Sequence, residues 1–257
     1  MAKPTYHHGD LRRALLAAVE EAITENGVAT LSMRDLARRA GVSHTAPTHH
    51  FRDKAGLLTA FAIEGFEQLA KALATSRLAS NSIVEMGVTY IRFAVTRRAM
   101  FEVMFRTDLY HRDDPDLLAA RARAADMLYA AVLDLPDAMP AASDGVPAPD
   151  GGVAASAGGA PADGASDGGA SAGGASAGGA TSTVVSVTDG VVRPARPAKP
   201  GAAETAPPEV RTAGRAGWSM AHGFATLWLT GAFPDSDGDP AEAARQLFTE
   251  LAWVHAS

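Results

Sequence analysis

Apolar residues along most of this chain recur with the period of an α-helix. In the first such segment, Asp10 to Asn26, leucine, valine, alanine and isoleucine return every three or four residues, which places them on one stripe of a helix. Gly27 follows at a position where a helix commonly ends. The same period predicts further helices over residues 53–76, 83–96, 115–133, 209–230 and 239–255. The pattern therefore predicts an all-α fold.

A shorter pattern between the first two of these segments carries the strongest functional signal. Residues 32–51 predict two short helices around a Gly-Val-Ser turn. Ser32 and Asp35 are spaced as an acidic version of the capping box, in which each side chain binds a backbone N–H of the other residue. Gly41 is expected to end the first helix in a left-handed conformation, and Ser43 to cap the second. Two helices in twenty residues predict a helix-turn-helix.

The second of these short helices is expected to read DNA, because few of its side chains are typical of a protein core. His44, Thr45, Thr48 and His49 offer donors, acceptors and a methyl group to the edges of base pairs. Asp53 is expected to cap the next helix, which puts Lys54 at a helix N-terminus. Free N–H groups and a lysine at that place both favour a phosphate.

These motifs resemble the TetR family of transcriptional regulators over about sixty residues. The matching positions are Leu15, Ala18, Ala22, Ile23, Ala40–Ser43, His50, Phe51, Lys54, Leu57 and Leu58. The resemblance implies that His50 contacts a DNA phosphate. The family commonly carries a tyrosine where this chain has Thr48, whose hydroxyl reaches less far. The expected DNA-binding residues are Ser43, His44, Thr45, Thr48, His49, His50 and Lys54.

Both ends of the chain also resemble one TetR subgroup. Trp218, His222 and Gly223 are similar to the Trp-His-Gly (WHG) motif of its C-terminal domain, and residues 6–12 resemble its N-terminus. The resemblance implies a homodimer whose last two helices form a four-helix interface, bound to a near-palindromic operator and released by a small hydrophobic ligand. The pocket is expected at Phe93, Met100, Met104, Phe105, Trp218 and His222, and the dimer interface at Phe224, Trp228, Leu247 and Leu251.

The net charge of −6 suits a DNA-binding protein only when it is divided along the chain. Residues 1–54 hold eight Lys or Arg against six Asp or Glu, together with five histidines, so the remaining residues carry all of the excess acidity. DNA binding is therefore expected to depend on a local patch and to weaken steeply with salt through counterion release.

The domain organisation is expected to follow changes in composition. Residues 1–54 are predicted as the DNA-binding domain and 55–140 as the first part of a helical regulatory domain. Residues 141–208 consist mainly of Ala, Gly, Ser, Asp and Pro, which predicts a disordered low-complexity insert. Residues 209–257 are predicted to complete the regulatory and dimerisation domain. In an alternative interpretation, the weakly alternating valines at 184–192 form a strand inside this linker that binds a partner.

An enzyme is the alternative class, and the sequence gives it little support. The chain has no cysteine, no Gly-rich phosphate loop, no Gly-x-Ser-x-Gly elbow and no His-Glu-x-x-His pair, so neither a catalytic residue nor a cofactor is expected. His111 with Asp113 and Asp114 fits a helix cap better than a metal site, and His7 and His8 fit a solvated arm. No metal is expected.

The sequence also bears on location and on the mode of regulation. No run of eighteen apolar residues occurs, and the N-terminus lacks the apolar core of a signal peptide, so we expect a cytoplasmic protein that does not contact a membrane. Two alternatives to a ligand-released repressor remain open. One is a DNA-binding dimer that needs no ligand, and the other is an activator.

Overall fold

The computed structural model describes residues 8–133, 198–233 and 238–254, and the side chains of residues 11–250 within those ranges. Every element in these ranges is a helix, so the predicted all-α fold is confirmed there. The elements are α1 (His8–Asn26), the 3-10 helix η1 (Val28–Thr30), α2 (Met33–Arg39), α3 (Ala46–Phe51), α4 (Lys54–Ser80), α5 (Ile83–Thr96), α6 (Arg98–Met104), α7 (Pro115–Leu133), α8 (Ala202–Thr205), α9 (Pro208–Leu229) and α10 (Pro240–Val254).

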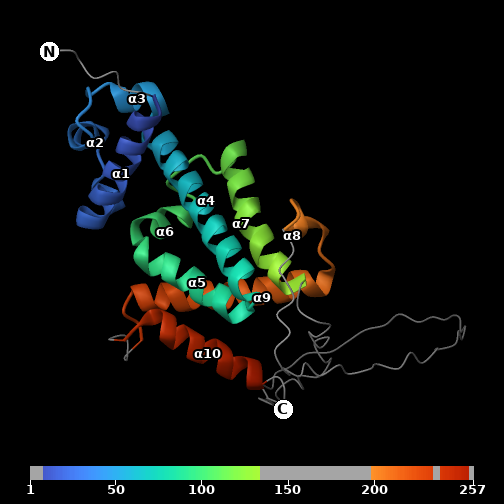
Figure 1. The fold of residues 1–257 in the computed structure, drawn as a ribbon. Coiled ribbons are helices and arrows are strands. Elements are labelled where there is room, and N and C mark those ends of the chain that lie inside the picture. The colour runs from blue at the N-terminus through green and yellow to red at the C-terminus, as the bar shows by residue number, and fades with distance from the viewer. Residues whose placement is uncertain (1–7, 134–197, 234–237, 255–257) are drawn as a thin grey trace, which may run out of the picture.

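The first four elements form a unit at one end of the molecule (Figure 1). Leu15 and Val19 of α1 and Leu36 of α2 are fully buried in it, because the apolar stripe predicted for the first helix faces the two short helices. Gly27 has a φ of +75°, a conformation that favours glycine, and its N–H donates to the Ile23 carbonyl (2.8 Å). α1 therefore ends where the sequence predicts.

α4 connects this unit to the rest of the chain (Figure 1). Asp53 caps the helix as predicted, since its side chain accepts from the Gly56 N–H at 2.7 Å. The helix continues past the predicted end near residue 76 to Ser80, where Asn81 takes a left-handed conformation with φ of +46°. Its long buried stripe is the reason for this length, because it packs against both α5 and α7.

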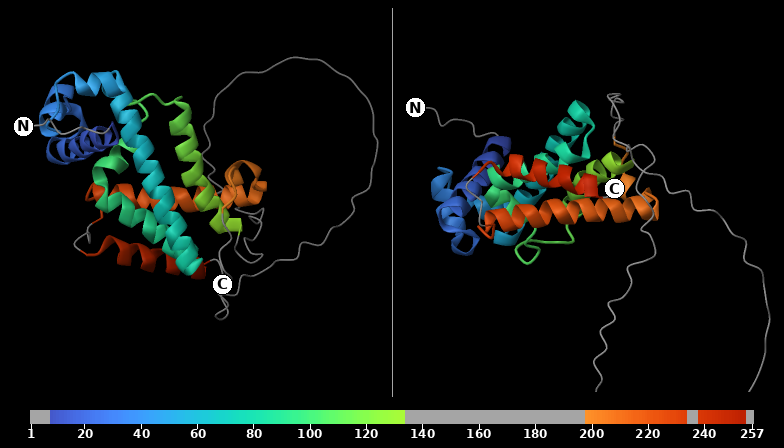
Figure 2. Two further views of the ribbon diagram at one scale, coloured as in Figure 1. Left: turned by 45° about the horizontal axis from the view of Figure 1, so that its top comes forward. Right: turned by 90° about the horizontal axis from the view of Figure 1, so that it is seen from below.

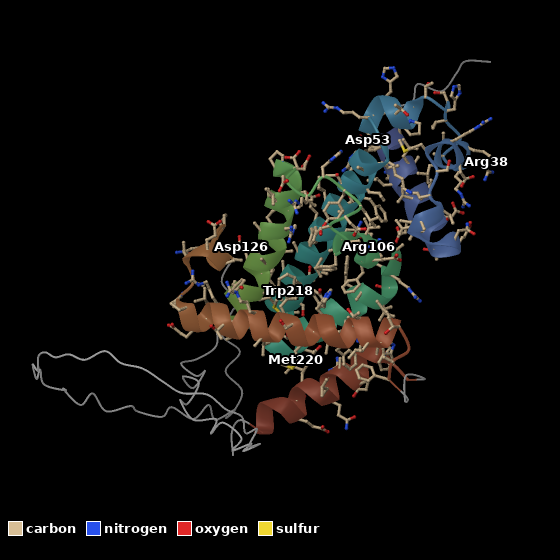
Figure 3. All side chains as sticks on the ribbon, turned by 180° about the vertical axis from the view of Figure 1, so that it is seen from behind. Arg38, Asp53, Arg106, Asp126, Trp218 and Met220 are labelled. Carbon is tan, nitrogen blue, oxygen red and sulfur yellow. The ribbon has the colours of Figure 1, made fainter. Side chains whose placement is uncertain are left out.

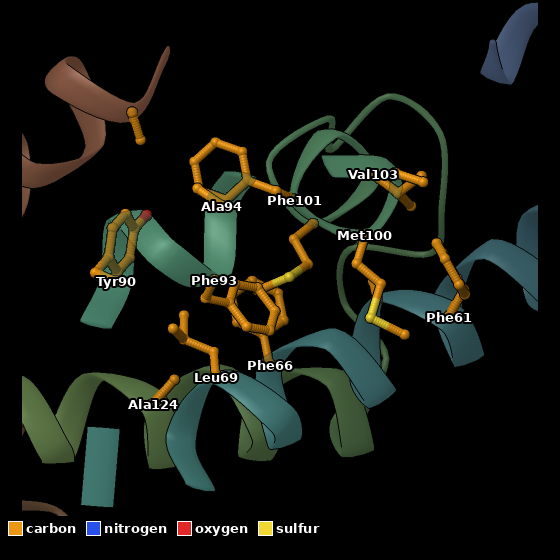
Figure 4. Close-up of a cluster of buried hydrophobic side chains, with 14 of the residues drawn as sticks. Phe61, Phe66, Leu69, Tyr90, Phe93, Ala94, Met100, Phe101, Val103 and Ala124 are labelled. Atoms are coloured by element: carbon orange, nitrogen blue, oxygen red, sulfur yellow. The ribbon is translucent and has the colours of Figure 1, made fainter. Parts of the chain in front are cut away.

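The main core lies between α4, α5, α6 and α7. Phe66 and Leu69 of α4 lie beside Phe93 of α5, with Met100 of α6 nearby (Figure 4). Gly65 allows α6 to come close, because a Cβ at this position would lie 2.6 Å from the Met104 sulfur. Phe93, Met100 and Met104, which were predicted as pocket residues, are therefore part of the core.

α9 and α10 both pack against α5 (Figures 1 and 2). Gly87 of α5 lies directly under the Phe248 ring of α10, since a Cβ there would approach the ring to 2.5 Å. A Cβ at Gly214 of α9 would likewise lie only 2.6 Å from the Tyr129 ring of α7. Two glycines thus set how closely these helices approach.

The chain re-enters the described structure at residue 198, inside the segment predicted as the insert. Residues 202–205 form α8, and Asp126 of α7 holds its start: the carboxylate accepts from the N–H groups of Gly201 and Ala203, both at 2.9 Å. Asp126 is buried. The composition of the segment does not predict this contact, because the carboxylate that accepts these hydrogen bonds lies 75 residues before Gly201 in the chain. The rest of the predicted insert, including the valine stretch, lies outside the described residues.

Candidate functional site

The α2–turn–α3 segment has the predicted geometry at its turn. Gly41 has a φ of +66°, and the Val42 N–H donates to the Ala37 carbonyl at 2.9 Å, which closes α2 with a left-handed residue. Pro47 is in the first turn of α3, where its missing N–H costs nothing. The predicted helix-turn-helix is therefore present, with α3 as its second helix.

The two predicted N-caps in this segment have different outcomes. Ser32 is the N-cap residue of α2, as predicted, but its side chain makes no cap bond. The Asp35 carboxylate, which was expected to complete the capping box, pairs with Arg38 and Arg39 at 2.7 Å each. Ser43 is not the N-cap of α3. The cap position falls on Thr45, and the Ser43 hydroxyl lies 3.2 Å from that of Thr45.

One face of α3 and of the turn before it is polar and exposed. Ser43, His44, Thr45, Thr48, His49 and His50 are exposed. Pro47 is buried, and Phe51 packs against the core, so these two hold the helix in place. The six exposed residues include most of those predicted to bind DNA, and they form one polar surface.

Lys54 is the first residue of α4, as predicted, but its side chain turns back toward η1. The ammonium lies 3.4 Å from the Val28 carbonyl, and the side chain is half-buried. Arg52, which sequence analysis did not single out, is exposed in a left-handed conformation with φ of +69°. It adds a positive charge between α3 and α4.

Arg39 joins α2 to α1 behind this surface. Its guanidinium contacts Glu25 at 2.6 Å and Asp35 at 2.7 Å. The hydrogen bond from Arg39 lowers the pKa of Glu25, and those from Arg39 and then Arg38 lower the pKa of Asp35. The lowered pKa values keep these carboxylates ionised near neutral pH, and the pair of Arg39 with Glu25 ties α2 to α1. Figure 3 shows Arg38 and Asp53 in this unit.

The predicted pocket residues separate into two groups. Phe105, Trp218 and His222 meet, with ring centroids 4.5 Å apart for Phe105 and His222 and 6.4 Å apart for Phe105 and Trp218. Phe93, Met100 and Met104 are instead buried in the core (Figure 4).

The residue that connects Trp218 and His222 of the first group was not predicted from the sequence. Tyr90 of α5 accepts a hydrogen bond from Trp218 Nε1 (3.2 Å) through its hydroxyl, which also lies 2.9 Å from His222 Nδ1. Burial raises the pKa of the Tyr90 phenol and lowers the pKa of the His222 imidazole. Tyr90, Phe101, Phe105, Trp218 and His222 are called the aromatic cluster below. The helical pattern marked Tyr90 only as an ordinary member of α5.

A groove of about 990 Å³ lies elsewhere, between α4 and α5. Polar side chains dominate its walls, among them Gln68, Lys71, Thr75, Thr89 and Arg92. None of the six predicted pocket residues lines it. The groove is therefore separate from the predicted effector site.

The predicted interface residues on α9 face inward. Phe224 is 7% exposed and packs against Trp228, Phe233 and Phe248 within the subunit, and its part in a dimer interface stays a prediction. Trp228 and Leu247 are half-buried, and the Leu251 side chain lies outside the described residues. The exposed large apolar residues of α9 are Trp218 (38%), Met220 (40%) and Leu227 (45%). Met220 lies on the other side of α9 from Trp218 (Figure 3).

His111, Asp113 and Asp114 do not meet as metal ligands. Asp114 caps α7 by accepting from the N–H groups of Asp116 and Leu117, and His111 Nε2 lies 3.6 Å from Asp53 Oδ1. In the described part of the chain no group of three His, Cys, Asp or Glu is arranged to hold a metal ion. Among the described helices, none has both the length and the apolar character needed to cross a membrane.

Two family comparisons cover most of the chain. Residues 15–61 match the family described as bacterial regulatory proteins, tetR family. Residues 83–251 match the family described as tetracyclin repressor-like, C-terminal domain.

Individual relatives match less of the chain in sequence. The HTH-type transcriptional regulator BetI of Escherichia coli O139:H28 is 45% identical over 62 residues, which cover 24% of this chain and 32% of that relative. The chain thus matches about a third of the length of this curated relative. A solved structure of a protein with unknown function from Rhodococcus sp. RHA1 is 23% identical, covers 98% of both chains and has a TM-score of 0.60. That likeness shows the shared fold.

Proposed function

Since this chain belongs to the TetR family of DNA-binding helix-turn-helix transcription regulators, we propose that it represses transcription as a homodimer on a near-palindromic operator, from which a small hydrophobic ligand releases it. The observation that carries the proposal is the exposed polar face of α3 and of the turn before it. Residues 1–54 form the DNA-binding domain in this proposal, and 55–140 with 209–257 form the regulatory domain. It acts in the cytoplasm, where the operator DNA is.

In the DNA complex, Thr48 and His49 read base edges in the major groove, together with His44 and Thr45. Ser43, His50 and Lys54 contact phosphates. For Lys54 this requires the ammonium to leave the Val28 carbonyl, a long contact of 3.4 Å that is easily exchanged for a phosphate. Arg52 joins them as a further phosphate contact, because it is exposed between α3 and α4.

The experiment for this part is selection of genomic DNA fragments by the full-length protein, followed by sequencing and a salt titration on the recovered site. A near-palindrome bound with a steep salt dependence is expected. Selection that enriches no sequence would overturn the proposed operator. His49→Ala tests the reading face in the same assay, with Thr75→Ala on the exposed side of α4 as the control.

The dimer forms through the exposed face of α9, joined by α10 of each subunit. Met220 and Leu227 lie on this face on either side of Gly223. A Cβ at Gly223 would meet nothing within 4 Å inside the chain, so the absence of a side chain there serves contacts outside the subunit. This also supports assignment to the subgroup with the Trp-His-Gly motif. Met220→Glu should give monomers in sedimentation velocity, and unchanged dimers would contradict this interface.

The effector binds at the aromatic cluster, where Trp218 is 38% exposed and His222 is half-buried. The proposal is supported by a route from this cluster to the DNA-binding domain. Phe105 leads into residues 106–114, and the His111 N–H donates to the Thr59 hydroxyl at 3.0 Å. The His111 ring lies beside Asp53, which caps α4 next to α3.

A ligand shifts this equilibrium only if it binds one of the two states more tightly. Thermal-shift screening of hydrophobic compounds, followed by operator binding in the presence of each compound that binds, tests the effector role. Compounds that bind and release DNA support it. If no compound binds, the alternative of a ligand-independent dimer is favoured. Raised transcription from the bound promoter would favour the activator.

A further inference from the structure

The hydrogen bonds of Trp218, Tyr90 and His222 run in one direction. An indole N–H only donates, so Trp218 Nε1 donates to the Tyr90 hydroxyl oxygen at 3.2 Å. Tyr90 is 1% exposed, and its own O–H therefore needs an acceptor within the protein. His222 Nδ1, at 2.9 Å, is that acceptor. The Tyr90 hydroxyl thus donates to His222.

This direction sets the tautomer of His222. A neutral imidazole that accepts at Nδ1 carries its hydrogen at Nε2. Burial lowers the pKa of His222, which agrees with a neutral ring. Nε2 makes no hydrogen bond to any residue that the structure describes, and it is not fully buried. It therefore ends the chain of hydrogen bonds as a donor without a partner in the described part of the protein.

The surroundings of this donor are apolar. The His222 ring lies 5.2 Å from the Phe101 centroid and 4.5 Å from that of Phe105. An ionised ligand group would lose much of its hydration against these rings, whereas a neutral acceptor would lose less and gain the Nε2–H. The site thus combines aromatic walls with one fixed N–H donor.

We propose that the effector carries a neutral hydrogen-bond acceptor, such as a carbonyl or ether oxygen, on an apolar body, and that this acceptor receives the Nε2–H of His222. The inference rests on the proposed effector site and adds the chemical class of its ligand. Trp218 and Tyr90 act as positioning residues, because they hold His222 in the tautomer that donates at Nε2.

The test uses matched probes that differ only in the acceptor. Each hydrocarbon of a panel is paired with the ketone of the same carbon skeleton, starting from butylbenzene and butyrophenone and continuing to larger members. Binding to the full-length protein is measured by thermal shift and calorimetry. The ketone of each pair is expected to bind about two to twelve times more tightly, the range for one neutral hydrogen bond.

Three results separate this inference from the proposed function. Tighter binding of the ketones supports the inference. Equal binding of ketones and hydrocarbons overturns it and leaves the effector site in place. If no member of the panel binds, the effector site itself is overturned, and the inference with it.

Two variants assign the preference to the Nε2–H. His222→Phe keeps a ring but removes the donor, so it should abolish the preference for ketones. His222→Gln keeps a side-chain N–H and should retain part of it. An undiminished preference in His222→Phe would overturn the inference.

Nitrogen chemical shifts of His222 give a readout that needs neither ligand nor variant. The unliganded protein should show the hydrogen on Nε2, and a hydrogen on Nδ1 would overturn the inference.

Discussion

Arg97, between α5 and α6, donates to both carboxylate oxygens of Glu20 on α1, at 3.0 and 3.3 Å. This pair ties the DNA-binding domain to the start of α6, the helix that ends just before Phe105. Both side chains are partly exposed, so the pair itself contributes little to stability. Its value lies in the orientation that it gives to α1 relative to α6.

Glu20→Gln is therefore expected to change the free energy of unfolding by less than about 1 kcal/mol but to weaken operator binding several-fold, because α1 loses its fixed orientation. Chemical denaturation and an operator titration on the same protein check this. Unchanged operator affinity would show that the pair does not orient the domain. Glu21→Gln is a useful control, since its contact with Arg39 at 3.6 Å stays within the N-terminal unit.

A second prediction concerns the contact between Gly87 and Phe248. Gly87→Ala puts a methyl group 2.5 Å from a ring carbon, so the ring must move and α10 shifts on α5. A loss of about 1–3 kcal/mol in unfolding free energy is expected, as for other overpacked cores. Gly217→Ala is the matched control, since its Cβ meets nothing within 4 Å. It should stabilise α9 by up to about 1 kcal/mol, and equal effects of the two changes would contradict the packing argument.

The sequence predicted most of the fold, because helical periodicity is local. α5 has the predicted bounds, and Asp53 and Asp114 cap the helices that follow them. The cap bonds predicted for Ser32 and Ser43 are absent, and Arg38 and Arg39 compete for the Asp35 carboxylate that the capping box needs. Such competition depends on rotamers that spacing alone does not specify.

The candidate sites were harder to predict, because they depend on contacts between distant segments. An aromatic residue on a C-terminal helix suits a core and an interface equally well. Phe224 became core because Phe248 of α10 packs against it. Tyr90 lies 128 residues before Trp218 in the chain, and no pattern within α5 indicates that pairing.

The contact of Asp126 with α8 gives a third prediction. Asp126→Ala leaves the N–H groups of Gly201 and Ala203 without their acceptor and opens a small space beside α7. A loss of about 1–3 kcal/mol in the free energy of unfolding is expected. Proteolysis near residues 199–205 should begin earlier than in the parent protein. Asp126→Asn keeps one acceptor oxygen and should lose less. If both variants cleave as slowly as the parent protein, the carboxylate does not hold α8.

The lowered pKa of His222 predicts a pH dependence of stability. In the unfolded chain a histidine titrates near pH 6.5, whereas burial lowers the pKa of His222 in the folded protein. The unfolded state therefore binds more protons in the window just below pH 6.5, and stability falls as the pH falls through it. The carboxylates with lowered pKa, such as Glu85 beside Arg245, lose their contribution to stability only at more acidic pH.

Unfolding free energies of the parent protein and of His222→Gln, measured between pH 5 and 8, isolate the contribution of this histidine. The parent should lose more stability than the variant between pH 7 and 5, and parallel curves would show that His222 is not desolvated as the Tyr90 contact requires.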